Sequence, residues 1–149
     1  RRDFIDSGMF HVEPKGYSSL SSYEKILRQR NYLLKTKNQK DIEFWDSELV
    51  TNNQRLSSMR SSYFANLNKE FVKIIHDLKI ELPEIYEEIS SLKMSYFKGW
   101  VSDNFQNELA NNRRKDFNCG YTSIGSHRSD ILITSNGRPV KESLALCLH

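Results

Sequence analysis

Residues 42–78 carry a long helical pattern that neither proline nor glycine interrupts. The apolar positions follow a heptad spacing, at Ile42, Trp45, Leu49, Leu56, Met59 and Tyr63. The spacing then changes to Leu67, Phe71, Ile74 and Leu78, a shift that relaxes a supercoil locally without ending a helix. At 1.5 Å per residue this helix would be about 55 Å long, more than a core of this size can cover. We therefore expect it to project as an arm.

A second helix is predicted immediately before this arm helix, over residues 19–37. Residues 21–24 read Ser-Ser-Tyr-Glu, which fits a capping box at a helix N-terminus. Its apolar side chains recur on one helical face, at Leu20, Tyr23, Leu27 and Leu34. The polar residues 36–40 leave only a short connection to the longer helix. The sequence thus predicts an antiparallel, coiled-coil-like arm of two main helices.

Short β segments are predicted at both ends of the chain, which gives an α+β fold class. Residues 4–12 are rich in aromatic and β-branched side chains and stop before Pro14, so we interpret them as a strand or an extended entry segment. A strand around residues 92–100 and a short helix over residues 103–114 follow the arm. Asn-Gly at positions 136 and 137 predicts a two-residue hairpin turn, because both residues tolerate positive φ.

Composition excludes several classes of protein. The chain has 149 residues, a length typical of one domain, and 38% of them are hydrophobic. No apolar run approaches the roughly 20 residues of a membrane-spanning helix, so no membrane partner is expected. Cys119 and Cys147 are too few and too far apart for a disulfide framework or a zinc site. We expect no metal ligands and a cytoplasmic location.

Charge is distributed unevenly along the sequence, although the net charge is only +3. Between residues 25 and 40 there are six basic residues and no acidic one. Lys25, Arg28 and Lys35 share one helical face with Tyr32, so the cations could follow DNA phosphates while the ring stacks on a base. A solvated helix face is the simpler interpretation of such a run. A solvated face also accounts for the acidic run of Glu81, Glu84, Glu87 and Glu88.

Several short motifs, taken in order, resemble the RecF family. They are Arg-Arg-Asp-Phe-Ile-Asp at 1–6, Leu-Arg-Gln-Arg-Asn at 27–31, Trp-Asp-Ser-Glu-Leu at 45–49, Gly-Tyr-Thr at 120–122, Gly-Ser-His-Arg-Ser-Asp at 125–130 and Asn-Gly-Arg-Pro-Val at 136–140. Each motif is weak alone, but their order covers nearly the whole chain. The combination of the first motif with the Gly-x-His-Arg-x-Asp loop is fairly specific.

The resemblance implies an ATPase head of the ABC and SMC-like kind, formed by both ends of a longer chain, with a helical arm inserted between them. Four segments are then expected: an opening head segment over 1–18, the arm over 19–82, a strand and short helix returning to the head over 83–117, and a head β-hairpin over 118–149. In the family, ATP closes a homodimer on DNA, including single-stranded to double-stranded junctions. RecR and RecO assist it in loading recombinase at single-strand gaps during repair, replication, recombination and the SOS response.

Residues carried over from the family fall into two motifs. Arg1, Arg2 and Asp6 belong to the opening motif, and the resemblance places the loop with Gly125, His127, Arg128 and Asp130 beside the nucleotide-binding head. Ser126 replaces the family's usual proline, which loosens the backbone there.

The sequence departs from the family where ATP chemistry is concerned. No GxxxxGK[ST] phosphate loop occurs in the chain, and residues 145–149 stand where the family continues into its signature motif. We therefore expect an interior segment without catalytic residues, metal or cofactor of its own, whereas ATP and magnesium would belong to the full-length parent. Whether ATP hydrolysis is part of this protein's function thus depends on that parent.

Two other functions remain open from the residues alone. A helical coiled-coil scaffold could use the arm to bind a protein partner, and the missing phosphate loop favours that alternative. A small hydrolase could use His127 as a base oriented by Asp130, but no nucleophile or metal spacing accompanies them.

Overall fold

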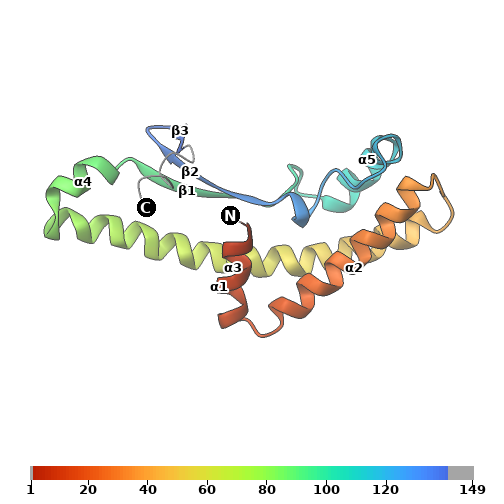
Figure 1. The fold of residues 1–149 in the computed structure, drawn as a ribbon, viewed down its shortest axis with the longest axis horizontal. Helices are drawn as coiled ribbons and strands as arrows, with labels where there is room; N and C mark the ends of the chain where they lie inside the picture. Colours follow the sequence, from red (N-terminus) through yellow and green to blue (C-terminus); the bar gives the residue numbers. More distant parts are fainter. Residues whose placement is uncertain (1, 141–149) are drawn as a thin grey trace.

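The structure is a computed structural model and describes residues 2–140 (Figure 1). Its helices are α1 (Arg2–Val12), α2 (Gly16–Lys35), α3 (Ile42–Glu81), α4 (Pro83–Ile89), α5 (Phe105–Cys119) and the 3₁₀ turn η1 (Ser126–Arg128). Its strands are β1 (Leu92–Phe97), β2 (Asp130–Ser135) and β3 (Arg138–Pro139). The described chain is mostly helical with one small antiparallel sheet in the order β1-β2-β3, which confirms the α+β prediction.

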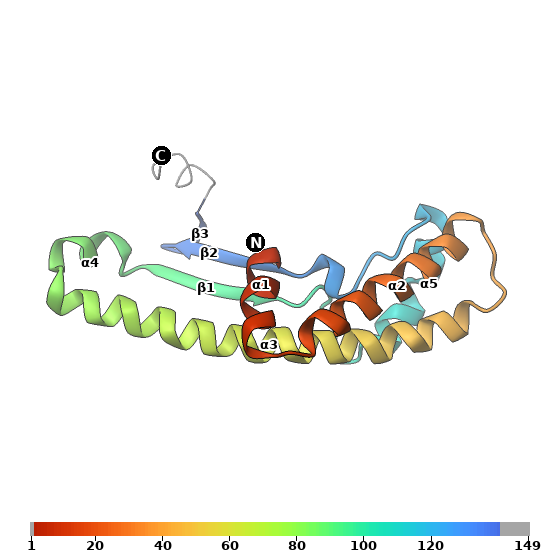
Figure 2. The ribbon, with the colours of Figure 1, turned by 60° about the horizontal axis from the view of Figure 1, so that its bottom comes forward.

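The long helix α3 is the axis of the molecule (Figure 2). Its 40 residues correspond to about 60 Å, and the helix passes through the predicted register change without a break. It ends at Glu81, two residues before Pro83, whose ring and missing N–H disfavour its continuation. The arm helix predicted from the heptad pattern is therefore confirmed.

Helix α2 packs against the first half of α3 and runs antiparallel to it (Figure 2). Leu49 and Leu56 of α3 and Tyr23 of α2 are almost completely buried where the two helices meet. Helix α5 contacts both α2 and α3, and its Phe105 and Leu109 join this core. The core thus lies at one end of α3, and the antiparallel pair of main helices is confirmed.

The opening segment is a helix, so the predicted strand over residues 4–12 is wrong. Ile5 and Met9 are both about 1% exposed and stand one helical turn apart, which places them on the face of α1 that contacts α3. Tertiary packing on that face outweighs the β-preferring composition of a short segment. Helix α2 also begins at Gly16, three residues earlier than predicted, and the expected capping box lies inside the helix.

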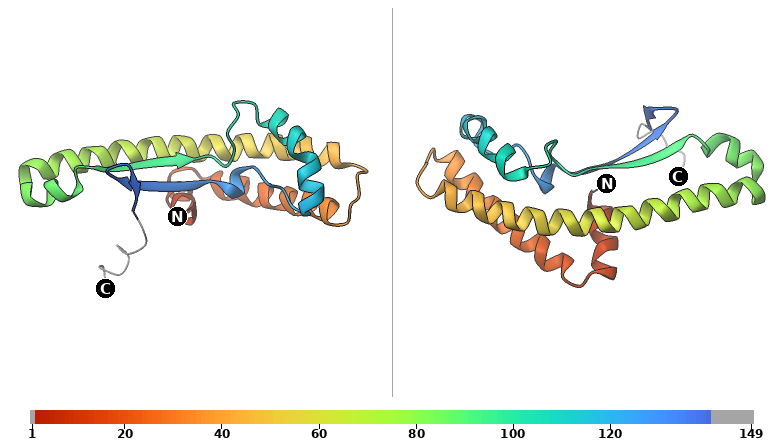
Figure 3. Two further views of the ribbon diagram at one scale, coloured as in Figure 1. Left: turned by 90° about the horizontal axis from the view of Figure 1, so that it is seen from above. Right: turned by 180° about the vertical axis from the view of Figure 1, so that it is seen from behind.

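The sheet runs beside the second half of α3 (Figure 3). Strands β1 and β2 pair with Leu92 opposite Ser135, and the Tyr96 ring of β1 lies 5.5 Å from the Phe64 ring of α3. The hairpin turn is confirmed, with φ of 50° at Asn136 and 75° at Gly137.

Two elements after the arm differ from the predictions. Helix α4 was not expected, because Pro83 was interpreted as a break, whereas proline also fits the first turn of a new helix. Helix α5 extends to Cys119 rather than ending near Arg114, and Gly120 with φ of 80° caps it. The segment boundaries at 18, 82 and 117 stay predictions, and residues 141–149 of the last segment lie outside the described residues. Within residues 2–140, no helix is both long and apolar enough to cross a membrane.

Candidate functional site

The predicted DNA-binding residues lie together on the outer face of α2. Lys25, Arg28 and Lys35 are exposed, and the Tyr32 side chain between them is 64% exposed. None of the three cations forms an ion pair with residues 2–140. The predicted face is therefore exposed on the surface of the protein. Its exposure is compatible with contact to DNA phosphates and equally with hydration alone. Its role in DNA binding stays a prediction.

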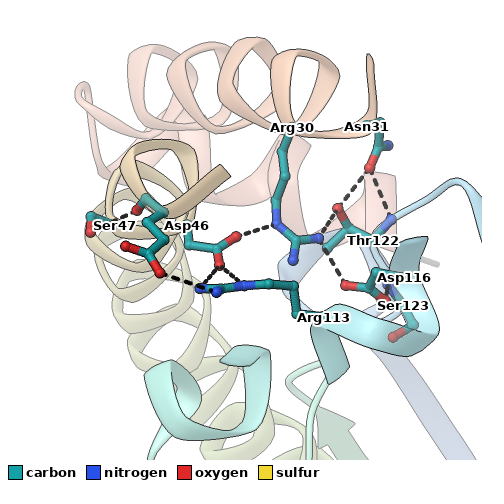
Figure 4. Close-up of polar contacts among 9 residues, drawn as sticks. Arg30, Asn31, Asp46, Ser47, Arg113, Asp116, Thr122 and Ser123 are labelled. Atoms are coloured by element: carbon teal, nitrogen blue, oxygen red, sulfur yellow. Dashed lines mark hydrogen bonds and ion pairs between the residues drawn. The ribbon is translucent and has the colours of Figure 1, made fainter. Parts of the chain in front are cut away.

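Arg30 belongs to the same basic run but lies on the opposite, buried face of α2 (Figure 4). Its guanidinium is fully buried, and its Nε donates to Asp46 Oδ1 of α3 at 2.6 Å. Its Nη1 donates to Asp116 Oδ2 of α5 at 2.8 Å and to Thr122 Oγ1 at 2.8 Å. A single side chain thus joins α2, α3, α5 and the segment after α5. Such buried pairs tolerate little displacement, because a separated partner would be left as an uncompensated charge.

Neighbouring polar groups extend this buried cluster. Arg113 of α5 donates from Nη2 to Asp46 Oδ2 at 2.7 Å, so that carboxylate serves two guanidinium groups. Asn31 Oδ1 accepts from the backbone N and the hydroxyl of Thr122 at 2.9 and 2.6 Å. The backbone N of Ser123 donates to Asp116 Oδ1 at 3.0 Å. Thr122 and Ser123, which precede the 125–130 loop, are therefore held against α2 and α5 respectively.

Arg60, in the middle of α3, forms a second buried cluster. It is 1% exposed and makes a two-pronged ion pair with Asp6 of α1, with both N–O distances at 2.8 Å. Its Nη1 also donates to the carbonyl oxygen of Ser126 at 2.7 Å. Asn53, two helical turns earlier, accepts from the Ser126 backbone N at 2.8 Å. Asp6 of the opening motif and the 125–130 loop, which are far apart in sequence, meet at this arginine.

The opening motif and the loop also touch directly. Arg2 Nη1 donates to the carbonyl oxygen of His127. Gly125 has φ of 132° and ψ of −179°, a conformation essentially restricted to glycine. A Cβ at this position would lie 2.6 Å from the Tyr23 hydroxyl, so the close approach to α2 also needs glycine. The structure thus joins the two family motifs, while Arg1 lies outside the described residues.

His127 is held in one tautomer by its neighbours. Its Nε2 lies 2.8 Å from the carbonyl oxygen of Thr122, which can only accept, so Nε2 carries the proton. Its Nδ1 lies 2.7 Å from the Tyr23 hydroxyl, which therefore donates to it. Burial raises the pKa of Tyr23 and keeps this hydroxyl protonated, and burial lowers the pKa of His127. A neutral histidine whose two nitrogens are both occupied is a structural bridge rather than a free base.

An open polar hollow of about 370 Å³ lies where the two motifs meet. Its lining comprises Arg2, Asp3, His127, Arg128, Ser129 and Asp130. The Arg128 guanidinium lies over the Tyr121 ring at 5.5 Å. Acidic and basic groups are mixed in the lining, and the hollow contains no activated nucleophile. Among residues 2–140, no cluster of three or more His, Cys, Asp or Glu side chains could hold a metal ion.

The sequence analysis did not identify Arg30 and Arg60 as buried ion-pair residues, although both stand at core positions of their helices. Arg30 stands four residues after Ile26 and three before Leu33, and all three side chains are buried. Arg60 stands four residues after Leu56, which is also buried. A charged residue at core spacing in a helix indicates a buried ion pair, because an isolated charge there would be too costly. The sequence alone does not identify the partners.

Curated proteins with related sequences align with nearly the whole of this chain. No protein-family model matches it. The curated DNA replication and repair protein RecF of Vibrio vulnificus (strain YJ016) is 31% identical over 147 residues, and those of Vibrio parahaemolyticus serotype O3:K6 (strain RIMD 2210633) and Aliivibrio fischeri (strain MJ11) are each 33% identical. Each alignment covers 97% of this chain but 39% of the relative, so the chain spans about two fifths of their length.

Two solved structures share the fold of this chain. A structure described as the recombination mediator protein RecF-ATP in the RecFOR pathway matches with a TM-score of 0.75 and 24% identity, over 99% of this chain and 43% of that chain. A second structure, described as RecF-ATPrS in the same pathway, has a TM-score of 0.71 over 93% of this chain. At this identity the likeness establishes the fold alone.

Proposed function

We propose that this chain, which is a partial RecF-like segment, is the helical arm and adjoining head region of a DNA-repair protein. Its relatedness to the recombination mediator RecF supports ATP-dependent DNA binding as the activity of the full-length parent. That parent would help load recombinase at single-strand gaps, acting in DNA repair, replication, recombination and the SOS response. Its partners would be DNA, RecR, RecO and a second copy of itself, in the cytoplasm.

The observation that carries the DNA-binding proposal is the exposed face of α2. Three cations and an aromatic ring share that face, and none of the cations forms an ion pair with residues 2–140. Cations of this kind neutralise phosphates and release counterions, while a ring such as Tyr32 can stack on an unpaired base. By contrast, Arg30 is fully buried against Asp46 and is not available to DNA, and Arg113 pairs with the same carboxylate.

The two buried arginine clusters support a mechanical role for the segment. Arg30 fixes α2 to α3 and α5, and Arg60 fixes α3 to α1 and to the 125–130 loop. A displacement of that loop would therefore move the DNA-binding face with it, since both are tied to the same long helix. In the parent, this connection would relate the nucleotide state of the head to DNA binding on the arm. The segment itself would contribute no ATP hydrolysis.

DNA binding by the 149-residue chain tests the proposal directly. The triple variant K25E/R28E/K35E should weaken binding to fluorescein-labelled single-stranded DNA, measured by anisotropy over a series of salt concentrations. Each neutralised phosphate contributes about 0.7 to the slope of log K against log salt on a single strand. The loss of three contacts should therefore make the slope shallower by about 2.

A matched control is available on the other half of the molecule. Lys69, Lys73 and Lys93 are exposed, and the variant K69E/K73E/K93E changes the net charge by the same amount. The proposal requires this control to keep most of the affinity and the salt slope. If both variants lose binding equally, net charge rather than the α2 face determines binding, and the site on α2 is wrong.

A further inference from the structure

The far end of the arm has an unusual surface. It consists of the last turn of α3 and the helix α4, and we call residues 80–88 the tip surface. Figure 2 places it at the end of α3 opposite to the half that α2 covers. The tip surface combines apolar and acidic side chains: Ile80, Leu82 and Ile85 with Glu81, Glu84, Glu87 and Glu88.

The apolar side chains of the tip surface are left in water. Ile80 is 80% exposed, Leu82 is 48% exposed and Ile85 is 44% exposed. Helix α4 buries none of its residues, although it packs back on α3. These large aliphatic side chains lie within six residues of one another, where α3 ends and α4 packs back on it. An interaction surface is where exposed apolar side chains gather in this way.

The four glutamates of the tip surface are largely not used by the fold. None of their side chains forms an ion pair or a hydrogen bond with the described residues 2–140. Lys79, the nearest cation in sequence, lies over the Tyr86 ring at 5.8 Å instead. Glu81 also occupies the C-terminal turn of α3, where the helix dipole disfavours a negative charge. Glu84 stands in the first turn of α4, where the helix dipole favours an acidic side chain. No such helix end accounts for Glu81, Glu87 and Glu88, so the folding of this segment explains only one of the four charges.

We propose that the tip surface is a docking site for a protein partner whose own surface has an apolar centre surrounded by lysine and arginine. The exposed aliphatic side chains would fill the apolar centre, and the glutamates would pair with the basic rim. DNA does not fit, since its phosphates would be repelled by the glutamates. This inference goes beyond the proposed DNA binding and does not depend on it.

A second copy of the chain fits less well than a different protein. The tip surface and the basic face of α2 are complementary in charge, but they lie along opposite halves of α3 in one elongated molecule (Figure 3). Contact between them would be head to tail, and such contacts grow into rings or open filaments rather than a closed dimer. A partner at the tip surface would also leave the α2 face free for DNA, because α2 lies along the first half of α3 and the tip surface lies at the end of its second half.

A peptide of the proposed chemistry is a suitable probe. We would titrate the 149-residue chain with an amphipathic helical peptide of leucine and lysine, and with a scrambled peptide of identical composition. Backbone amide chemical shifts should change at residues 80–88 with the amphipathic peptide. Its dissociation constant should be at least about tenfold lower than that of the scrambled peptide, the factor that burial of one leucine side chain supplies.

Variants of exposed residues separate the two contributions without disturbing the core. E84K/E87K should weaken binding through charge, and I80S/I85S should weaken it through the apolar contact, each by about tenfold or more. The control E24K/E70K reverses two exposed glutamates away from the tip and should bind the peptide like the parent chain.

Four results would overturn the proposal. The peptide could fail to bind, or the two peptides could bind equally, which would indicate attraction by charge alone. The amide shifts could map to another surface. Self-association that I80S/I85S abolishes in sedimentation would identify a second copy as the occupant. Weakened DNA binding in I80S/I85S would identify nucleic acid as the occupant.

Discussion

Replacing Arg60 with methionine tests the idea that one buried arginine fastens the arm to the 125–130 loop. The substitution keeps an unbranched side chain but removes four hydrogen bonds: two to Asp6, one to the Ser126 carbonyl and one to the Ser129 hydroxyl. Asp6 would then be left 95% buried without its cation, since only 5% of it is exposed. We expect R60M to lower the free energy of unfolding substantially.

The magnitude follows from the burial of the pair. Removal of one partner from a buried ion pair costs about 3–5 kcal/mol, because the remaining charge is uncompensated. That is a large part of the about 5–15 kcal/mol that stabilises a typical domain. Replacing both charges, in D6L/R60M, removes the orphaned carboxylate and should recover more than half of the loss. The surface pair between Arg113 and the 84% exposed Glu43 supplies the contrast, and E43Q should cost less than about 1 kcal/mol.

Urea unfolding followed by circular dichroism would measure all four chains, and hydrogen exchange would report where protection is lost. Faster exchange in R60M should concentrate at residues 125–130 and in α1. A loss below about 1 kcal/mol for R60M, or a double variant no more stable than R60M, would refute the reasoning. Either result would mean that Asp6 reaches solvent or that another group replaces the guanidinium.

Three further predictions concern the loop and the nucleotide. G125A should destabilise the chain by about 3 kcal/mol or more, because a Cβ is opposed both by φ of 132° and by the Tyr23 hydroxyl, which would lie 2.6 Å from it. The control G137A, at φ of 75° with open space around it, should cost about 1 kcal/mol in the same urea assay. The pKa of His127 in the folded chain is below its ordinary value of 6.5, so as pH decreases the histidine is protonated in the unfolded chain before it is protonated in the folded chain. The free energy of unfolding should therefore fall as pH decreases below about 6.5, until His127 of the folded chain is also protonated. Urea midpoints between pH 5 and 8 should show this dependence in the parent chain and lose it in H127Q. Calorimetry with ATP and magnesium should detect no micromolar binding to this chain, and saturable binding at a defined stoichiometry would show that a nucleotide site exists without GxxxxGK[ST].

Patterns within a single element were readable from the sequence. The heptad spacing and the absence of proline and glycine predicted α3, and Asn136-Gly137 predicted the β2–β3 turn. Strand β1 and the outward face of Lys25, Arg28 and Lys35 were likewise visible. Each of these depends on the periodicity or the φ preference of neighbouring residues, which a linear sequence states directly. Whether that α2 face binds DNA is a separate matter that periodicity does not address.

Features that depend on distant partners were decided only by the tertiary structure. Residues 4–12 have the composition of a strand, and contact with α3 makes them a helix. Arg30 appeared to be one more cation of an exposed run, but Asp116, 86 residues later, accounts for its burial. Arg60 required Asp6, 54 residues earlier. The sequence by itself determined where the long helix lies and which of its faces is apolar. Which charges are buried was decided by the fold, because a charge enters a core only where chain closure brings it an opposite charge.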